Sequence, residues 1–237
     1  SLEALNAGEA TRLLVDTSPD LRQQMLDAEV VRIDGVAFTH SHADQAHGID
    51  DVRAFVYKRG ARLDAYMSPE TRTALRARFG YIFETPEGSG YPPLMADQAI
   101  EPDETVHIDG PGGQLDFSFF DVVHGHEPCS GLRLGPLAYS PDENGLDAAA
   151  MHAISGSRVW IVDALRDKPH PSHTHVNLAL DWLAQINPEL GILTNLHIDL
   201  DYKALLERLP DGARPAYDGL EVTMSLKDSA IVQISPV

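Results

Sequence analysis

A group of histidines directly behind an apolar segment constrains this chain more than any other feature. The residues GVAF at 35–38 have the character of a buried strand, and the sequence THSHADQAHG follows at 39–48. Three histidines and one aspartate therefore fall close together where a strand would end. Neutral imidazoles bind zinc, iron and manganese, and a carboxylate adds a harder oxygen ligand. The pattern predicts a metal site at a strand end rather than a polar turn with solvated histidines.

The rest of the chain alternates strand patterns with helix patterns, which is typical of a layered α/β domain. The further histidines again lie just after predicted strands, where α/β folds place their sites. We expect a single domain over residues 1–237, with residues 85–98 as a Gly/Pro-rich loop. The predicted strands are 12–18, 35–40, 61–68, 114–124, 158–165, 191–197 and 220–226, and the predicted helices are 19–29, 43–60, 69–80, 177–187 and 201–210.

Composition excludes several classes of protein. The chain has 237 residues with 18 Lys and Arg against 36 Asp and Glu, so its net charge is −18. This acidity disfavours a nucleic-acid polymer or an anionic membrane as partner, because both need clustered cations. The single cysteine excludes an internal disulfide framework. The sequence shows neither a membrane-spanning run nor a secretory signal, so we expect a cytoplasmic protein.

The histidine motif resembles the T-H-x-H-x-D-H-x-x-G signature of the metallo-β-lactamase superfamily. The resemblance is strongest to its phosphoribosyl cyclic phosphate phosphodiesterase branch. It implies an α/β fold, an αββα sandwich of two mixed β-sheets flanked by helices. That branch usually begins with an earlier strand and a Gly-rich turn, so we expect the first edge strand to be missing. The matching segments are LLVDTSPDLR (13–22), VVHGH (122–126), LAYSPD (137–142), PSHTHVNL (171–178), LTNLHIDLDY (193–202) and AYDGLEV (216–222).

The resemblance also implies a first metal site. Its ligands would be His40, His42, His124 and Asp142, a set of three imidazoles and one carboxylate. His126 is a rival for His124, because a shift of the alignment would exchange the two. We expect this site to bind one zinc or manganese ion tightly.

A second metal site of the family would use Asp44, the residue after it, Asp142 and a late histidine. Here the residue after Asp44 is Gln45, and the late position holds Asn195. Amide oxygens are weak ligands for zinc or iron, so we expect the second site to be weak or empty. His197 follows two residues later and is an alternative ligand, because alternate strand residues share a face.

The same resemblance assigns the catalytic roles. His173 would protonate the leaving oxygen, and Asp44 would orient or deprotonate the attacking water. His175 and Arg53 are candidate substrate-binding residues, although Arg53 has acidic neighbours with which it could pair instead. Asp163, at the end of a predicted strand, is a candidate for orienting a histidine.

The expected function is that of a metal-dependent hydrolase, a phosphodiesterase that acts on a small cyclic phosphate or nucleotide-like ester. The expected partner is thus a small-molecule phosphate ester, with a homodimer as a further option. Two alternatives stay open at this point. One is a lactone or thioester hydrolase of the same fold, and the other is a non-catalytic protein that binds a metal or nucleotide.

Overall fold

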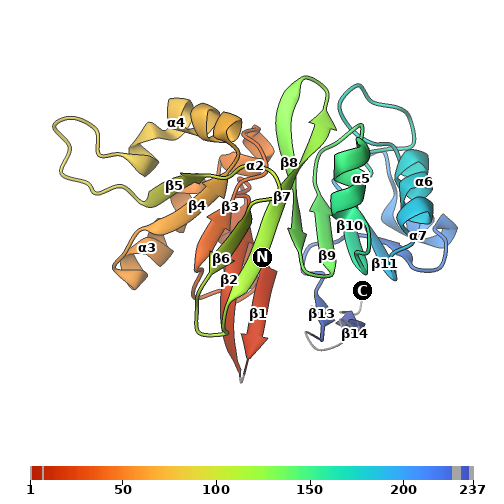
Figure 1. The fold of residues 1–237 in the computed structure, drawn as a ribbon, viewed down its shortest axis with the longest axis horizontal. Helices are drawn as coiled ribbons and strands as arrows, with labels where there is room; N and C mark the ends of the chain where they lie inside the picture. The colour runs from red at the N-terminus through yellow and green to blue at the C-terminus, as the bar shows by residue number, and fades with distance from the viewer. Residues whose placement is uncertain (1, 7, 226–230, 235–237) are drawn as a thin grey trace. The chain divides into compact units, whose positions relative to one another are not determined.

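The computed structural model describes residues 2–6, 8–225 and 231–234 and divides the chain into two compact units (Figure 1). The first unit is Ser1–Phe119 and the second is Phe120–Val237. Each unit has a hydrophobic cluster of its own, and the clusters include the fully buried side chains of Phe38 in the first unit and Trp160 in the second. The expectation of one domain over the whole chain stays a prediction.

The first unit is built on a five-stranded sheet in the order β1-β2-β3-β4-β5. The β1–β2 pair is antiparallel, and the other pairs are parallel, so the sheet is mixed. β3 is buried along its whole length, as its apolar sequence predicts. The strands are β1 (Leu2–Asn6), β2 (Glu9–Val15), β3 (Gly35–Ala37), β4 (Leu63–Met67) and β5 (Met95–Ala99).

β5 corrects the prediction of a loop over residues 85–98. Its sequence, MADQA, lacks the β-branched and aromatic residues that favour strands. Backbone pairing with β4 and burial of Met95 hold it in the sheet instead. Such tertiary support is invisible in a local pattern.

The helices of the first unit are α1 (Leu21–Asp27), α2 (Ala43–Ala46), the 3-10 helix η1 (Ile49–Val52), α3 (Arg53–Arg59) and α4 (Pro69–Phe83). The single helix expected over 43–60 is therefore divided. Gly48 causes the break, because its N–H group donates to the carbonyl of Thr17 at 2.9 Å. A Cβ atom at Gly48 would lie 1.9 Å from the carbonyl oxygen of Ser18. This close approach anchors the junction between the end of α2 and the start of η1 against the turn that follows β2.

The strand β7 (Leu115–His124) passes from the first unit into the second, and β6 (Thr105–Ile108) pairs with its first half. In the second unit the strands follow the order β12-β11-β10-β9-β8-β7. β8 and β9 are antiparallel, whereas β9, β10, β11 and β12 are parallel, so this sheet is mixed too. The bounds are β8 (Glu127–Leu134), β9 (Leu137–Ser140), β10 (Val159–Asp163), β11 (Leu190–Thr194) and β12 (Ala213–Pro215).

The described residues of the second unit form the helices α5 (Ala148–Ile154), α6 (Val176–Ile186) and α7 (Tyr202–Arg208). A separate antiparallel pair consists of β13 (Val222–Met224) and β14 (Ile231–Ile234). The strand predicted over 220–226 is thus shorter, and its last residue lies outside the described residues. Within the described residues, no helix combines the length and apolar character needed to cross a membrane. The predicted α/β class with two mixed sheets is confirmed.

Candidate metal centre

The first two candidate ligands follow directly on β3. His40 is buried, with 1% of its surface exposed. The preceding residue, Thr39, is fixed by Asp16, whose carboxylate accepts the Thr39 N–H and the Thr39 hydroxyl, both at 2.8 Å. Asp16 itself has a left-handed φ of 57° at the end of β2. The strand end, rather than a flexible loop, therefore sets the position of His40.

These contacts also indicate which tautomer a neutral His40 adopts. The hydroxyl of Thr39 lies 3.1 Å from Nδ1 of His40. Because this hydroxyl donates its proton to Asp16, its oxygen accepts from a protonated Nδ1. The lone pair of a neutral His40 is then on Nε2. A carboxylate–hydroxyl–imidazole chain of this kind orients metal-binding histidines.

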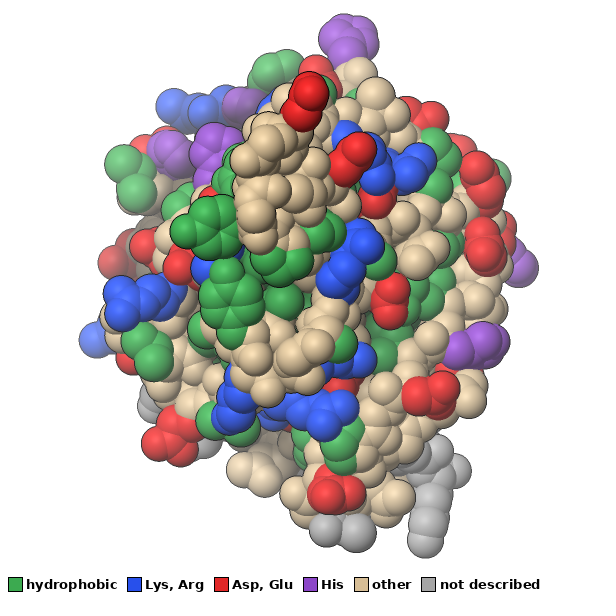
Figure 2. Space-filling view, turned by 90° about the vertical axis from the view of Figure 1, so that its left-hand side faces the viewer, with side chains coloured by type: hydrophobic (Ala, Val, Ile, Leu, Met, Phe, Trp, Pro, Cys, Tyr) green, Lys and Arg blue, Asp and Glu red, His purple; other side chains and the backbone are tan. Residues whose placement is uncertain are grey.

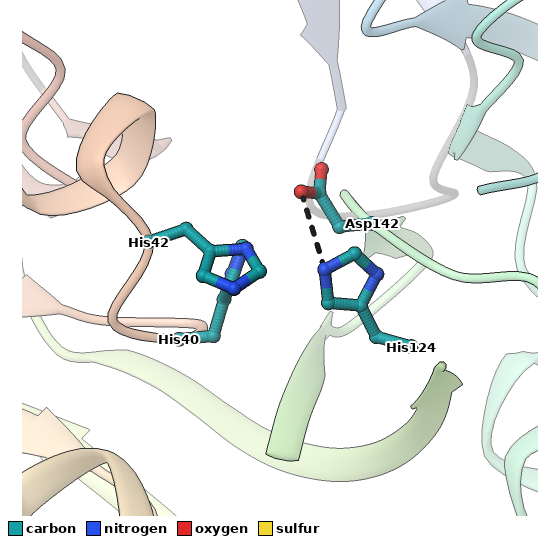
Figure 3. Close-up of side chains that lie close together, drawn as sticks. All are labelled: His40, His42, His124 and Asp142. Atoms are coloured by element: carbon teal, nitrogen blue, oxygen red, sulfur yellow. Dashed lines mark ion pairs between the residues drawn. The ribbon is translucent and has the colours of Figure 1, made fainter. Parts of the chain in front are cut away.

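His42 is the residue that precedes α2, and its ring meets that of His40 edge-on at 4.7 Å between centroids (Figure 3). Asp44 and Gln45 lie in the first turn of α2, where Asp44 is exposed and Gln45 is partly exposed. The amide nitrogen of Gln45 lies 3.4 Å from a carboxylate oxygen of Asp44. Gln45 thus turns its donor group, not its carbonyl, toward the acid.

The other two candidate ligands belong to the second unit. His124 ends β7 and is buried, and Asp142 follows β9 and is buried as well. Nδ1 of His124 donates to the carbonyl of Ser172 at 2.7 Å, so its Nε2 carries the lone pair. That Nε2 lies 4.0 Å from a carboxylate oxygen of Asp142, as the dashed line in Figure 3 shows. His126, the rival of His124, is exposed.

Asn144 links the turn after β7 to the loop before α6, and the sequence alone did not reveal this role. Its side-chain oxygen accepts the N–H of Gly125 at 3.1 Å, and its amide nitrogen donates to the carbonyl of Pro171 at 2.6 Å. Gly125 has a left-handed φ of 59°. Asn144 therefore holds the Ser172 carbonyl where His124 needs its hydrogen-bond acceptor.

Behind Asp142 lies a network around Asp163, the last residue of β10. Nδ1 of His173 lies 3.0 Å from one carboxylate oxygen of Asp163, and the backbone N–H of Thr174 donates to the same oxygen at 3.2 Å. The amide nitrogen of Asn195 lies 3.3 Å from the other oxygen of Asp163 and 3.2 Å from Asp142. Two carboxylates face this nitrogen, which identifies it as the NH₂ group rather than the carbonyl of Asn195.

Burial shapes the electrostatics of this network. It raises the pKa of Asp163 to about 6, and the hydrogen bond from His173 partly opposes that rise. Glu143, which sequence reasoning missed, is completely buried, and burial followed by the charge of Asp163 raises its pKa well above the ordinary value. The Ser140 hydroxyl donates to Glu143 at 2.9 Å and accepts from Trp160 at 2.9 Å. The burial of Glu143 could not be predicted from the sequence, because the segment ENG is typical of a turn that faces solvent.

The structure gives three further candidates local partners. Nδ1 of His175 accepts the N–H of Leu178 at 3.2 Å and thereby caps α6. His197 is exposed and lies 3.3 Å from Asp199. Arg53 pairs with Asp50 at 2.9 Å and is on the helix α3, as the acidic neighbours in the sequence suggested.

Comparisons with known proteins agree with this architecture. The model of the beta-lactamase superfamily domain matches residues 11–198. A crystal structure described as a new diphosphatase from the PhnP family superposes with a TM-score of 0.81 at 29% identity, over 93% of this chain and 82% of that one. The Zn²⁺-bound PqqB of Methylobacterium extorquens gives a TM-score of 0.67 at 18% identity, over 88% of this chain and 82% of that one.

A curated relative adds a different name. The octanoyltransferase of Porphyromonas gingivalis is 31% identical over 229 residues, which make up 95% of this chain but 45% of the relative. The chain thus spans less than half the length of that protein.

Two mixed sheets with helices, together with histidines and aspartates at strand ends, define a metallo-β-lactamase-fold hydrolase. The match over residues 11–198 shows that the chain belongs to the beta-lactamase superfamily domain family. Members of this fold family are generally metal-dependent hydrolases and include diphosphatases and nucleases. The His and Asp side chains described above are ligands of the type that a divalent metal ion takes.

Proposed function

We propose that this protein is a metal-dependent hydrolase of small phosphate esters or phosphoanhydrides. His40, His42, His124 and Asp142 would together hold one divalent ion, zinc or manganese. The observation that carries this proposal is the tautomer that hydrogen bonds impose on two of the candidate ligands. Hydrogen bonds to Thr39 and to the Ser172 carbonyl leave Nε2 of His40 and of His124 with a lone pair. Three imidazoles and one carboxylate fit zinc and manganese.

A divalent ion bound there supplies Lewis acidity and lowers the pKa of a bound water. The chain itself supplies the proton transfers. Asp163 accepts the Nδ1–H of His173, so Nε2 is the atom of this ring that holds and releases the catalytic proton. We assign to His173 the protonation of the leaving oxygen. Asp44, exposed at the start of α2, is the proposed acceptor of the proton from water.

The similarity to the diphosphatase supports a phosphate substrate, because its identity of 29% extends over 93% of this chain. Within that class we propose a small cyclic phosphate or a nucleotide-like ester. One observation favours a second candidate, an ester or thioester of a carboxylic acid. The relative from Porphyromonas gingivalis is named as an octanoyltransferase, although this chain accounts for 45% of it. A substrate panel separates the two classes.

We further propose that the centre holds a single tightly bound ion, because two amides stand where a second ion would need ligands. The NH₂ group of Asn195 donates to Asp142 at 3.2 Å, and that of Gln45 donates to Asp44 at 3.4 Å. Each amide thus directs hydrogens at a carboxylate that a second cation would otherwise contact. A neutral NH₂ group satisfies such an oxygen without binding a metal.

The test combines metal content with turnover. We expect about one equivalent of zinc or manganese in the purified protein, and a loss of metal and of activity in His40→Ala. The double variant Gln45→His/Asn195→His is expected to take up a second equivalent. The matched control is Asn6→His/Gln23→His, which changes two exposed amides outside the centre and leaves the stoichiometry unchanged. A parent protein without tight metal refutes the metal centre, whereas two tight equivalents in the parent refute only the one-ion proposal.

The substrate class is tested on the same preparations. Bis-p-nitrophenyl phosphate and cyclic nucleotides are expected to be hydrolysed, and p-nitrophenyl octanoate and simple lactones are not. The reverse preference would replace the phosphoesterase proposal by the acyl-ester alternative. Binding of nucleotide without turnover of any substrate would instead identify a non-catalytic protein.

A further inference from the structure

The first unit contains a cavity that the metal centre does not use. It has a volume of about 310 Å³, which is at the lower end of the range for small-molecule sites. Ile33 is buried, Phe55 packs against the core of this unit, and Val31 is 62% exposed. The lining residues are Val31, Arg32, Ile33, Phe55, Lys58 and Arg59, so three apolar side chains stand beside three cationic ones.

A buried carboxylate fixes two of the three cations. The side chain of Asp34 is 0% exposed, and Arg32 approaches one of its oxygens at 2.6 Å. Arg59 lies 3.8 Å from the same oxygen and donates to the carbonyl of Asp34 at 3.3 Å. The second oxygen of Asp34 accepts the backbone N–H of Arg12 at 3.0 Å. The two guanidinium groups are therefore held in place before any ligand arrives, and each has N–H donors left over.

The charge of this cavity has the opposite sign to that of the chain. Three cations and one carboxylate surround it, whereas the whole protein carries −18. Figure 2 shows Lys and Arg side chains gathered next to apolar ones on the lower part of its face. Lys58 and Arg59 are in the last turn of α3, where cations also favour the helix dipole. That effect does not account for Arg32, nor for the apolar cavity between the charges.

We propose that this cavity binds a small carboxylate with an apolar body, such as a short-chain fatty acid. The guanidinium groups of Arg32 and Arg59 match a carboxylate in geometry, and Lys58 adds a third cation. Val31, Ile33 and Phe55 provide the surface on which an aliphatic chain loses contact with water. A purely inorganic anion would leave this apolar wall unused. The site is independent of the metal centre, because it shares no residue with it.

The experiment titrates the metal-loaded protein with hexanoate by calorimetry. Hexanoate is expected to bind with a one-to-one stoichiometry, while acetate and hexan-1-ol bind more weakly because each lacks one half of the recognised chemistry. Binding of hexan-1-ol or of acetate as tight as that of hexanoate overturns the proposal, and so does an absence of saturable hexanoate binding. His40→Ala is expected to bind hexanoate like the parent, which separates this cavity from coordination to the metal.

Two variants locate the site without disturbing the core. Lys58→Gln removes one exposed charge and is expected to weaken hexanoate binding about fivefold, the equivalent of one favourable surface charge interaction. Val31→Glu places an acid at the rim and is expected to weaken it further. The matched control is Lys203→Gln, an exposed lysine of α7 in the other unit, which should change nothing. Equal affinities in Lys58→Gln and Lys203→Gln overturn the proposal.

Discussion

The two units stabilise their buried carboxylates in different ways. In the first unit, the side chains of Asp34 and Asp97 have fixed cations beside them, whereas Asp16 is held by hydrogen bonds from Thr39. Asp97 on β5 is 5% exposed and receives two hydrogen bonds from Arg76, at 2.6 and 2.8 Å, and another from Arg72. The pairing with Arg76 lowers the pKa of Asp97 to about 2, although desolvation opposes the shift. Asp34 is held by Arg32 and Arg59 in the same manner.

In the second unit, Glu143 and Asp163 are completely buried next to Asp142, and their hydrogen bonds come from neutral or titratable groups. Ser140 donates to Glu143, while His173, Asn195 and the backbone of Thr174 contact Asp163. Burial is therefore the dominant effect on Asp163 and raises its pKa to about 6, whereas the arginine contacts lower the pKa of Asp97. Acids that lack a permanent cation are balanced by mobile protons or by an added cation, and this is the property of a reaction centre. The paired acids of the first unit have a structural role.

Acids paired with arginine and acids without such a partner are expected to differ most in their effect on catalysis. Asp163→Asn replaces the acceptor of the His173 Nδ1–H with an amide that can present its own N–H₂ to the ring. The wrong tautomer of His173 would then predominate, and we expect kcat/KM for bis-p-nitrophenyl phosphate to fall roughly 10³-fold. Metal content should stay unchanged, because Asp163 does not belong to the proposed ligand set and is proposed to position His173.

Asp97→Asn is the matched control for this variant, since it removes an acid with a largely buried side chain from the other unit. It is expected to leave kcat/KM at the level of the parent. Asp163→Asn with normal metal content and activity within a few-fold of the parent would refute the positioning role. Asp163→Glu restores a carboxylate acceptor for the His173 Nδ1–H. A kcat/KM that is higher in Asp163→Glu than in Asp163→Asn, over a wider range of pH, would support the positioning role.

The second largest effect is expected on the free energy of unfolding, at Asp97, which is paired with arginines. The pKa of Asp97 is lower in the folded protein, about 2, than its ordinary value of 3.8. Its contribution is therefore fully present above pH 3.8 and is lost as the pH falls toward 2. The difference corresponds to about 2 kcal/mol at most, and the partial exposure of both arginines reduces it to about 1 to 2 kcal/mol.

We accordingly expect urea unfolding at pH 7 to show Asp97→Asn destabilised by about 1 to 2 kcal/mol, with the gap reduced to about half by pH 3. Asp167→Asn removes the acid of an exposed pair with Arg208 and should cost less than about 0.5 kcal/mol. A gap for Asp97→Asn that does not change between pH 7 and pH 3 would contradict the ion-pair explanation.

The two units also differ in how far their candidate ligands could be predicted from the sequence. His40 and His42 lie in one contiguous motif directly after a predicted strand, so the local pattern alone was enough to name them as candidates. The candidate ligands of the second unit come from separate turns, and only a family resemblance brought His124 and Asp142 into consideration. Asn144 and Glu143 escaped notice because their roles depend on burial and on backbone acceptors distant in sequence. Such information is absent from a local pattern.

The expectation for His197 shows where a periodicity argument stops applying. It assumed that residues 195 and 197 alternate along a strand, but β11 ends at Thr194. Asn195 then takes a left-handed φ of 58°, which turns the chain, and His197 contacts Asp199 instead. The helix predicted over 43–60 failed for a related reason, since the close contact at Gly48 is tertiary. Element types were predictable, whereas their ends depended on contacts with other segments.

The smallest effect is expected at the acid that has no fixed cation and no assigned chemistry. Burial raises the pKa of Glu143 well above its ordinary value, so the folded protein favours the protonated, neutral side chain. Glu143→Gln keeps that shape and neutrality, and the Ser140 hydroxyl can donate to its carbonyl oxygen. At pH 5 we therefore expect the free energy of unfolding to stay within about 1 kcal/mol of the parent.

The pH dependence gives a sharper test. A glutamate with a raised folded-state pKa makes the folded protein less stable as the pH rises above the unfolded value of 4.5, and glutamine does not titrate. Urea unfolding between pH 5 and pH 7 should thus show the variant gaining on the parent, the opposite of Asp97→Asn, whose deficit shrinks only in acid. A large deficit of Glu143→Gln at pH 7 would mean that Glu143 is ionised and compensated by a cation, and the distinction between the two units would then fail at this residue.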